Sequence, residues 1–167
     1  MKMPKVLIVM GSDSDYPVVE AALQVLRDFS VDFDVRVCSA HRTPGTASDL
    51  ASNAEERGFD VIIAAAGKAA HLPGVFAAYT ALPVIGIPIK SSSVGGLDSL
   101  LSIVQMPAGI PVATVALDGA ENAALLAVQM ISIRDSDLRK KMAEYKVKMA
   151  AKVADKDAKL QEKLAKI

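Results

Sequence analysis

The sequence predicts an α/β fold, a three-layer α/β/α sandwich with a five-stranded parallel sheet in the middle. Short aliphatic runs alternate with stretches of helical spacing along the chain. These runs are nearly continuous in apolar residues, which is typical of strands that are buried on both faces. Because parallel strands need crossover connections, helices are expected to cover both faces of the sheet.

The first strand, loop and helix set the pattern for the rest of the chain. Residues 5–10 form an aliphatic run that ends at Gly11, and a loop of Gly, Ser and Asp follows it. Apolar residues then recur at helical spacing over residues 18–29, with Ser14 or Asp15 available as the helix cap. This segment is therefore expected to be a buried strand, a polar loop and an amphipathic helix.

Four more units repeat this pattern. Their strands are expected at residues 33–37, 61–65, 84–87 and 112–115. Helical spacing follows from 44 toward 58, from 73 to just before 82, from 97 to 105 and from 122 to 133. The sequence does not reveal the strand order, but a flavodoxin-like order would place a ligand at the carboxyl ends of the first and third strands.

The C-terminal segment, residues 136–167, is expected to be one long helix. Its apolar residues recur at spacings of three, four or seven and trace a single stripe: Leu138, Met142, Tyr145, Met149, Val153, Leu160, Leu164 and Ile167. The sandwich is complete without this helix, so we expect the stripe to lie at a subunit interface. The alternative is that the helix folds back onto its own domain. The chain then divides into an α/β domain at 1–135 and a helical extension at 136–167.

Charge and composition disfavour several classes of function. The net charge is zero, but residues 136–167 hold ten basic and five acidic residues, so the remainder of the chain is acidic. The whole chain has only three Tyr, four Phe and no Trp, so its acidic part lacks the basic and aromatic surface that nucleic acid requires. The apolar runs are too short to span a membrane, and Cys38 has no partner for an intrachain disulfide. We expect a cytoplasmic protein with no nucleic-acid or membrane partner.

The sequence contains two histidines, and both follow predicted strands. His41 follows the second strand and His71 follows the third, while a serine-containing loop follows the first. Carboxyl ends of parallel strands share one edge of the sheet, so the three loops are expected to meet at one crevice. The alternative for each histidine is an ordinary capping or core position.

The loop after the first strand, GSDSD at residues 11–15, suits a phosphate. It supplies the hydroxyls of Ser12 and Ser14 and the N–H groups of a helix N-terminus. It lacks the Gly-Lys-Ser ending of an ATP-binding Walker loop and the three-glycine spacing of an NAD-binding loop. Asp15 could accept hydrogen bonds from ribose hydroxyls. The alternative is ordinary helix capping by Ser14 or Asp15.

The loop after the second strand, SAHRTP at residues 39–44, places an imidazole beside a guanidinium. Arg42 offers a planar fork that binds phosphate through two hydrogen bonds, and Ser39 adds a hydroxyl. The alternative is that Arg42 pairs with a surface acid. A nucleophilic role for Cys38 is disfavoured because this residue is expected to belong to the strand.

The loop after the third strand, AGKAAHLPG at residues 66–74, consists mainly of small residues, so its backbone can approach a ligand closely. Lys68 either contacts an anion or points to solvent, and the sequence leaves both readings open. Ligand spacing does not favour a metal site made by His41, His71 and Asp15. We therefore expect no metal.

Four segments together resemble the catalytic subunit of phosphoribosylaminoimidazole carboxylase, a family of purine biosynthesis. They are residues 10–15, 39–44, 69–74 and 98–107, and the resemblance extends through residue 133. The HRTP sequence at 41–44 is similar to the bacterial, class I form, which acts as N5-carboxyaminoimidazole ribonucleotide mutase. The form that uses free carbon dioxide typically has Lys after this histidine, so Arg42 favours the mutase.

The resemblance implies a cofactor-free isomerase that moves carbon dioxide from the exocyclic nitrogen of its substrate to carbon 4 of the imidazole ring. It implies that His41 acts as general acid and base. Ser12, Asp15 and Arg42 match ribonucleotide-binding positions of the family, and the His71 loop would help to enclose carbon dioxide. The candidate site comprises His41 as the catalytic residue and the following substrate-binding residues: Ser12, Ser14, Asp15, Ser39, Arg42, Lys68 and His71.

The sequence departs from the family pattern at two positions. Lys68 stands where a second Gly is common, and Tyr16 replaces a frequent Trp. The resemblance also implies a homo-octamer and, as a functional neighbour, the ATP-dependent N5-carboxyaminoimidazole ribonucleotide synthetase. Two alternatives stay open: an aminoimidazole ribonucleotide carboxylase that uses free carbon dioxide, and a flavodoxin-like module that binds a nucleotide without turning it over.

Overall fold

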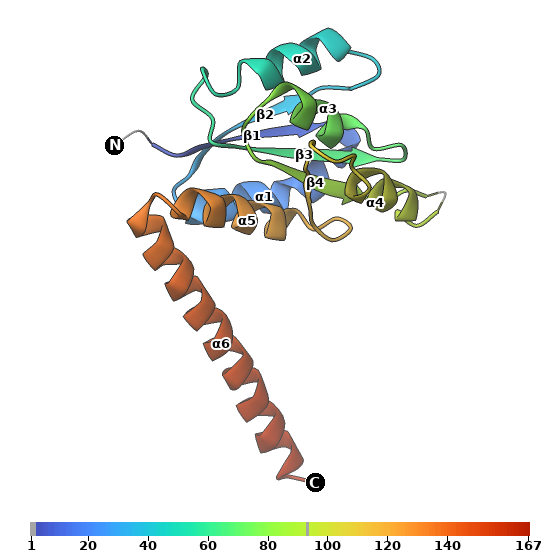
Figure 1. Cartoon of the computed structure of the whole chain (residues 1–167). Coiled ribbons are helices and arrows are strands. Elements are labelled where there is room, and N and C mark those ends of the chain that lie inside the picture. The colour runs from blue at the N-terminus through green and yellow to red at the C-terminus, as the bar shows by residue number, and fades with distance from the viewer. Residues whose placement is uncertain (1–2, 93) are drawn as a thin grey trace.

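The sheet has the order β2-β1-β3-β4-β5 in the computed structural model, which describes residues 3–92 and 94–167 (Figure 1). All four strand pairings are parallel. The strands are β1 (Lys5–Met10), β2 (Asp32–Val37), β3 (Val61–Gly67), β4 (Val84–Ile89) and β5 (Ala113–Thr114). The predicted sandwich is confirmed, and the strand order is the flavodoxin-like one.

Helices cover both faces of the sheet. They are η1 (Asp13–Asp15), α1 (Tyr16–Asp28), α2 (Pro44–Ser52), α3 (Leu72–Tyr79), α4 (Leu97–Val104), α5 (Ala120–Ser132) and α6 (Ser136–Leu164). Figure 1 shows α1 and α5 below the sheet and α2 and α3 above it. Three of these helices, α1, α2 and α3, lie in the connections between consecutive parallel strands, and α5 follows the last strand.

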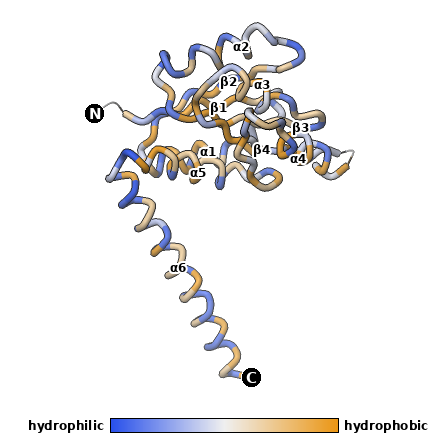
Figure 2. The backbone as a smooth tube through the Cα atoms, in the orientation of Figure 1, coloured by the Kyte–Doolittle hydropathy of each residue, from blue (hydrophilic) through white to orange (hydrophobic). Residues whose placement is uncertain are grey.

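The strands β1, β3 and β4 bury both of their faces because their side chains alternate between two apolar clusters, whereas the edge strand β2 is partly exposed. In β1, Val6, Ile8 and Met10 belong to the cluster with α1 and α5, whereas Leu7 and Val9 belong to the cluster with α2 and α3. Figure 2 shows the hydrophobic colour concentrated in the sheet. Burial on both sides explains why β1, β3 and β4 have nearly continuous apolar sequences.

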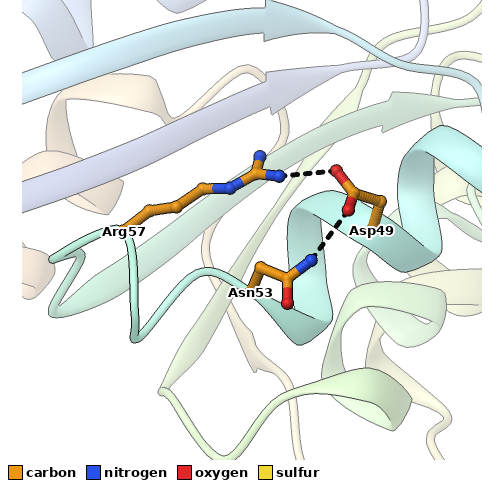
Figure 3. A network of polar contacts seen from close by, with 3 residues as sticks. All are labelled: Asp49, Asn53 and Arg57. Atoms are coloured by element: carbon orange, nitrogen blue, oxygen red, sulfur yellow. Dashed lines mark hydrogen bonds and ion pairs between the residues drawn. The ribbon is translucent and has the colours of Figure 1, made fainter.

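Two predicted elements are shorter than expected. The second helix was predicted to continue toward residue 58, but α2 ends at Ser52 and a turn follows it. In this turn the Asn53 amide and the Arg57 guanidinium each donate to the Asp49 carboxylate over 2.7 Å (Figure 3). The fifth strand was predicted over 112–115, but β5 pairs with β4 only at Ala113 and Thr114.

The long helix α6 packs on its own domain at the start and then leaves it. Leu138 and Met142 are buried in the cluster with α1 and α5, and the Tyr145 hydroxyl donates to Glu121 over 3.2 Å. Beyond this point the helix projects away from the body (Figure 1). Val153 is 65% exposed, and the later residues of the stripe are more than half exposed. The back-folding alternative is therefore correct for the first turns only.

Within the described part of the chain, no helix combines the length and the apolar character that a membrane span requires.

Candidate active site at the carboxyl edge of the sheet

A cavity of about 540 Å³ lies where the loops after β1, β2 and β3 meet. All the residues predicted for the site line this cavity: Ser12, Ser14, Asp15, Ser39, His41, Arg42, Lys68 and His71. Small residues line the rest of its wall almost entirely: Gly11, Ala40, Ala66, Gly67, Ala69 and Ala70, with Leu72 as the larger exception. The volume is that of a typical small-molecule site.

The hydroxyls of the first loop are organised around Ser12. Its Oγ accepts hydrogen bonds from the backbone N–H of Ser14 over 3.3 Å and from the Ser14 hydroxyl over 2.9 Å. Ser12 therefore caps η1, and Asp15, one of the two residues predicted as the cap of the following helix, is the N-cap residue of α1. Among the described residues, the Asp15 side chain makes no capping bond to α1, which leaves this carboxyl at the cavity wall.

The environment of Asp15 disfavours its charged form. Partial burial removes water from the carboxylate and raises its pKa, and the nearby carboxylates of Asp118 and Asp13 act in the same direction. Hydrogen bonds from Ser14 and Ser12 oppose this shift without cancelling it. Carboxyl groups whose pKa is shifted by burial and by neighbouring charges are often found at functional sites, so Asp15 is a candidate functional residue.

The Arg42 side chain connects the loops after β1 and β2 through hydrogen bonds. Its Nη2 donates to the carbonyl of Gly11 over 3.1 Å, and its Nε lies 3.4 Å from the hydroxyl oxygen of Ser39. No carboxylate within residues 3–92 and 94–167 forms an ion pair with this guanidinium, so the surface-acid alternative is not observed. Arg42 is exposed and keeps further N–H donors for an anion.

Cys38 lies directly after β2 rather than within it, and its backbone N–H donates to the carbonyl of Met10 over 2.8 Å. The residue is 1% exposed. Burial raises the pKa of its thiol, and the hydrogen-bond partner Thr43 compensates in part. A buried protonated thiol is a poor nucleophile, so the structure disfavours a covalent role for Cys38.

The two histidines contact each other directly. The Nε2 atom of His41 lies 2.7 Å from the Nδ1 atom of His71, and the two rings meet edge to face with centroids 4.8 Å apart. The sequence placed both residues at one edge of the sheet but gave no signal for this bond. It depends on the side-chain directions in two separate loops.

The loop that carries His71 has unusual backbone geometry. Lys68 has a φ of 57° and Ala70 a φ of 43°, in the left-handed region that favours glycine. This geometry gives a physical reason why Gly suits position 68. The Lys68 residue is exposed and lines the cavity, so a cation faces the same space as Arg42.

The arrangement suits a phosphorylated, hydroxyl-bearing small molecule. Arg42, Lys68 and the Ser12 and Ser14 hydroxyls can bind an anion, and the imidazole nitrogens can donate or accept hydrogen bonds. In the described portion of the chain, His, Cys, Asp and Glu side chains do not form a group of three or more that could hold a metal ion.

The chain matches one protein family, several named proteins and solved structures. The family described as AIR carboxylase matches residues 5–152. The N5-carboxyaminoimidazole ribonucleotide mutase of Pyrococcus abyssi is 61% identical over 147 residues, which cover 88% of this chain and 84% of that protein. The phosphoribosylaminoimidazole carboxylase of Saccharomyces cerevisiae is 54% identical over 161 residues, which cover 96% of this chain and 28% of that protein.

The crystal structure of Treponema denticola PurE superimposes on this chain with a TM-score of 0.84 and 31% sequence identity. The match covers 94% of this chain and 98% of that one. The likeness therefore includes nearly the whole architecture described above.

Proposed function

Because the chain belongs to the AIR carboxylase family, we propose that it is an N5-carboxyaminoimidazole ribonucleotide mutase of purine biosynthesis. It converts N5-carboxyaminoimidazole ribonucleotide to 4-carboxy-5-aminoimidazole ribonucleotide. The observation that carries this proposal is the high identity to a protein of that name over most of both chains. The cavity with its imidazoles, hydroxyls and cations supplies groups suited to this reaction.

In the proposed mechanism His41 is the general acid and base. As an imidazolium it donates a proton to the carbamate nitrogen, the carbon–nitrogen bond breaks, and carbon dioxide and aminoimidazole ribonucleotide remain in the cavity. Ring carbon 4 then attacks carbon dioxide, and His41 removes the proton from that carbon. The proton given in the first step is recovered in the second, so the reaction needs no external acid or base.

The other cavity residues bind the substrate and retain the intermediate. Arg42, Ser12 and Ser14 hold the phosphate, with Ser39 supporting the guanidinium through the contact described above. Asp15 accepts hydrogen bonds from the ribose hydroxyls. Lys68 and His71 border the carboxyl group and carbon dioxide, and enclosure there prevents the gas from escaping before it is captured.

A homo-octamer with α6 at a subunit interface is part of the same proposal. The distal part of α6 carries an exposed apolar stripe and lies in a basic segment, while the rest of the chain is acidic. Opposite charge and an uncovered apolar stripe favour the body of a second copy as the surface that α6 contacts. The stripe supports self-association, and the copy number comes from the family resemblance.

We further propose a cytoplasmic location and a functional neighbour, the ATP-dependent N5-carboxyaminoimidazole ribonucleotide synthetase that makes the substrate. The yeast relative supports such a neighbour, because this chain matches a small share of that protein and leaves room for a second activity on the same polypeptide.

The test is conversion by purified protein in two parallel reactions without ATP or added metal. One contains N5-carboxyaminoimidazole ribonucleotide, and the other contains aminoimidazole ribonucleotide with bicarbonate. Fast carboxyl transfer in the first reaction alone is the expected result. Preferential turnover in the second would identify a carboxylase that uses free carbon dioxide and would contradict the proposal.

A His41→Asn variant distinguishes two interpretations of the chain: an enzyme that uses His41, and a module that binds nucleotide without any dependence on His41. Asn removes the titratable ring while it keeps a polar side chain of similar reach. If His41 is the general acid and base of the mutase, this variant should lose nearly all turnover. Turnover close to that of the unmodified protein would show that another group is the general acid and base.

A further inference from the structure

The hydrogen bond between the two imidazoles constrains where protons can reside. A separation of 2.7 Å between His41 Nε2 and His71 Nδ1 accommodates one hydrogen between the two nitrogens. One ring must donate and the other must accept with an unprotonated nitrogen. The bond therefore cannot persist with an imidazolium on both residues, and the pair holds a single positive charge at most while it is intact.

The surroundings favour His41 as the donor. His71 is the N-cap of α3, and its carbonyl accepts the backbone N–H of Val75 over 3.0 Å. The helix N-terminus carries a partial positive charge, which disfavours a further positive charge on the His71 ring. The other charged residues that line the cavity are Lys68, Arg42 and Asp15.

We propose that His71 is a positioning residue for His41: its Nδ1 accepts the Nε2–H of His41 and leaves His41 Nδ1 as the nitrogen that exchanges a proton with the substrate. This inference rests on the proposed function, in which His41 is the general acid and base. His71 selects the ring nitrogen that reacts.

The proton balance follows from this geometry. The imidazolium of His41 carries hydrogens on both nitrogens, donates the one on Nδ1 to the carbamate nitrogen, and keeps the one on Nε2 in the bond to His71. The neutral ring that remains has a free lone pair on Nδ1. That lone pair takes the proton from ring carbon 4, so the imidazolium is restored and His71 never changes its protonation state.

Nuclear magnetic resonance of the free, full-length protein labelled with nitrogen-15 tests the bond directly. The sequence has two histidines, so the imidazole region contains two rings, and the His71→Asn variant assigns them. We expect a nitrogen–nitrogen coupling across the hydrogen bond between His41 Nε2 and His71 Nδ1, with the hydrogen on His41 Nε2. A neutral His41 that carries its hydrogen on Nδ1, or the absence of the coupling, would overturn the proposal.

Two substitutions at position 71 distinguish positioning from a structural role. The amide oxygen of His71→Asn stands close to the place of Nδ1 and can accept the same hydrogen bond, whereas His71→Leu cannot. Asn is also a favourable N-cap, and in the described structure the His71 side chain makes no capping bond, so both variants are expected to fold.

We expect His71→Leu to lower kcat about tenfold to a hundredfold, the range seen when a group that orients a histidine is removed, with little change in KM. His71→Asn should keep most of kcat and keep the hydrogen on His41 Nε2. Equal losses in the two variants would refute positioning by an acceptor. The nitrogen spectra are recorded without substrate, so a failure of the proposed reaction would leave their result unaffected.

Discussion

Replacing Arg42 by Ala tests the assignment of the phosphate site. The guanidinium bridges the loops after β1 and β2 through Gly11 and Ser39 and retains N–H groups for a ligand. Ala removes the charge and the fork while it leaves the strands intact. Binding of the ribonucleotide should therefore weaken through loss of the phosphate contact.

The size of the effect follows from the exposure of Arg42. A hydrogen bond to a charged group contributes about 1.5–3 kcal/mol, and an exposed guanidinium belongs toward the lower end of that range. At about 1.4 kcal/mol per factor of ten, the expected increase in Kd is about tenfold to thirtyfold.

The assay is calorimetric titration with aminoimidazole ribonucleotide and, in parallel, with the nucleoside that lacks the phosphate. The loss should appear for the nucleotide and be nearly absent for the nucleoside, since the nucleoside has no phosphate to lose. Arg57→Ala is the matched control, because Arg57 pairs with Asp49 outside the cavity (Figure 3). Equal losses for both ligands, or an unchanged Kd for the nucleotide, would refute the placement of the phosphate.

Three further predictions concern stability and assembly. Gly86→Ala should destabilise the fold by about 1–3 kcal/mol, because a Cβ there would overlap Ile103, whereas Gly45→Ala in α2 meets open space and should be neutral or stabilising. Urea denaturation compares the two, and a Gly86→Ala protein of unchanged stability would contradict the packing. Asp15→Asn should raise Tm at neutral pH and lose this advantage in acid. Folding raises the pKa of Asp15, so the charged carboxylate destabilises the folded state at neutral pH. This cost is absent once the pH falls below the pKa that Asp15 has in the unfolded chain, because the carboxyl is then protonated in both states. An advantage that persists in acid would have another cause. Truncation after residue 146 should dissociate the assembly but preserve the fold. Sedimentation velocity that finds the same number of chains in the truncated and full-length assemblies would contradict the placement of α6 at a subunit interface.

The sequence predicted the layers of the fold because burial on two faces leaves continuous aliphatic runs. It could not predict the strand order, since β1, β3 and β4 are all buried aliphatic strands and their sequences do not show which of them are neighbours. The short length of β5 was also missed, because Val112 and Val115 are as apolar as strand residues but fall outside its paired part. For α6, periodicity identified an apolar stripe but did not show that Leu138 and Met142 pack on their own domain.

The composition of the site was more predictable than its geometry. Loops that follow neighbouring parallel strands converge, so the residues that line the cavity could be named in advance. The left-handed backbone at Lys68 and Ala70 carries no reliable signal in residues other than Gly. The bond between His41 and His71 depends on side-chain directions in two loops, which spacing along the chain does not determine.

Transfer of a labelled carboxyl group tests the central claim most directly. N5-carboxyaminoimidazole ribonucleotide with carbon-13 in its carboxyl group is converted in the presence of excess unlabelled bicarbonate, and the product is analysed by mass spectrometry. A mutase that keeps carbon dioxide in the cavity should place the carbon-13 on ring carbon 4 of nearly all product molecules. Product whose carboxyl group matches the unlabelled bicarbonate would show that the gas leaves and re-enters, which contradicts the account.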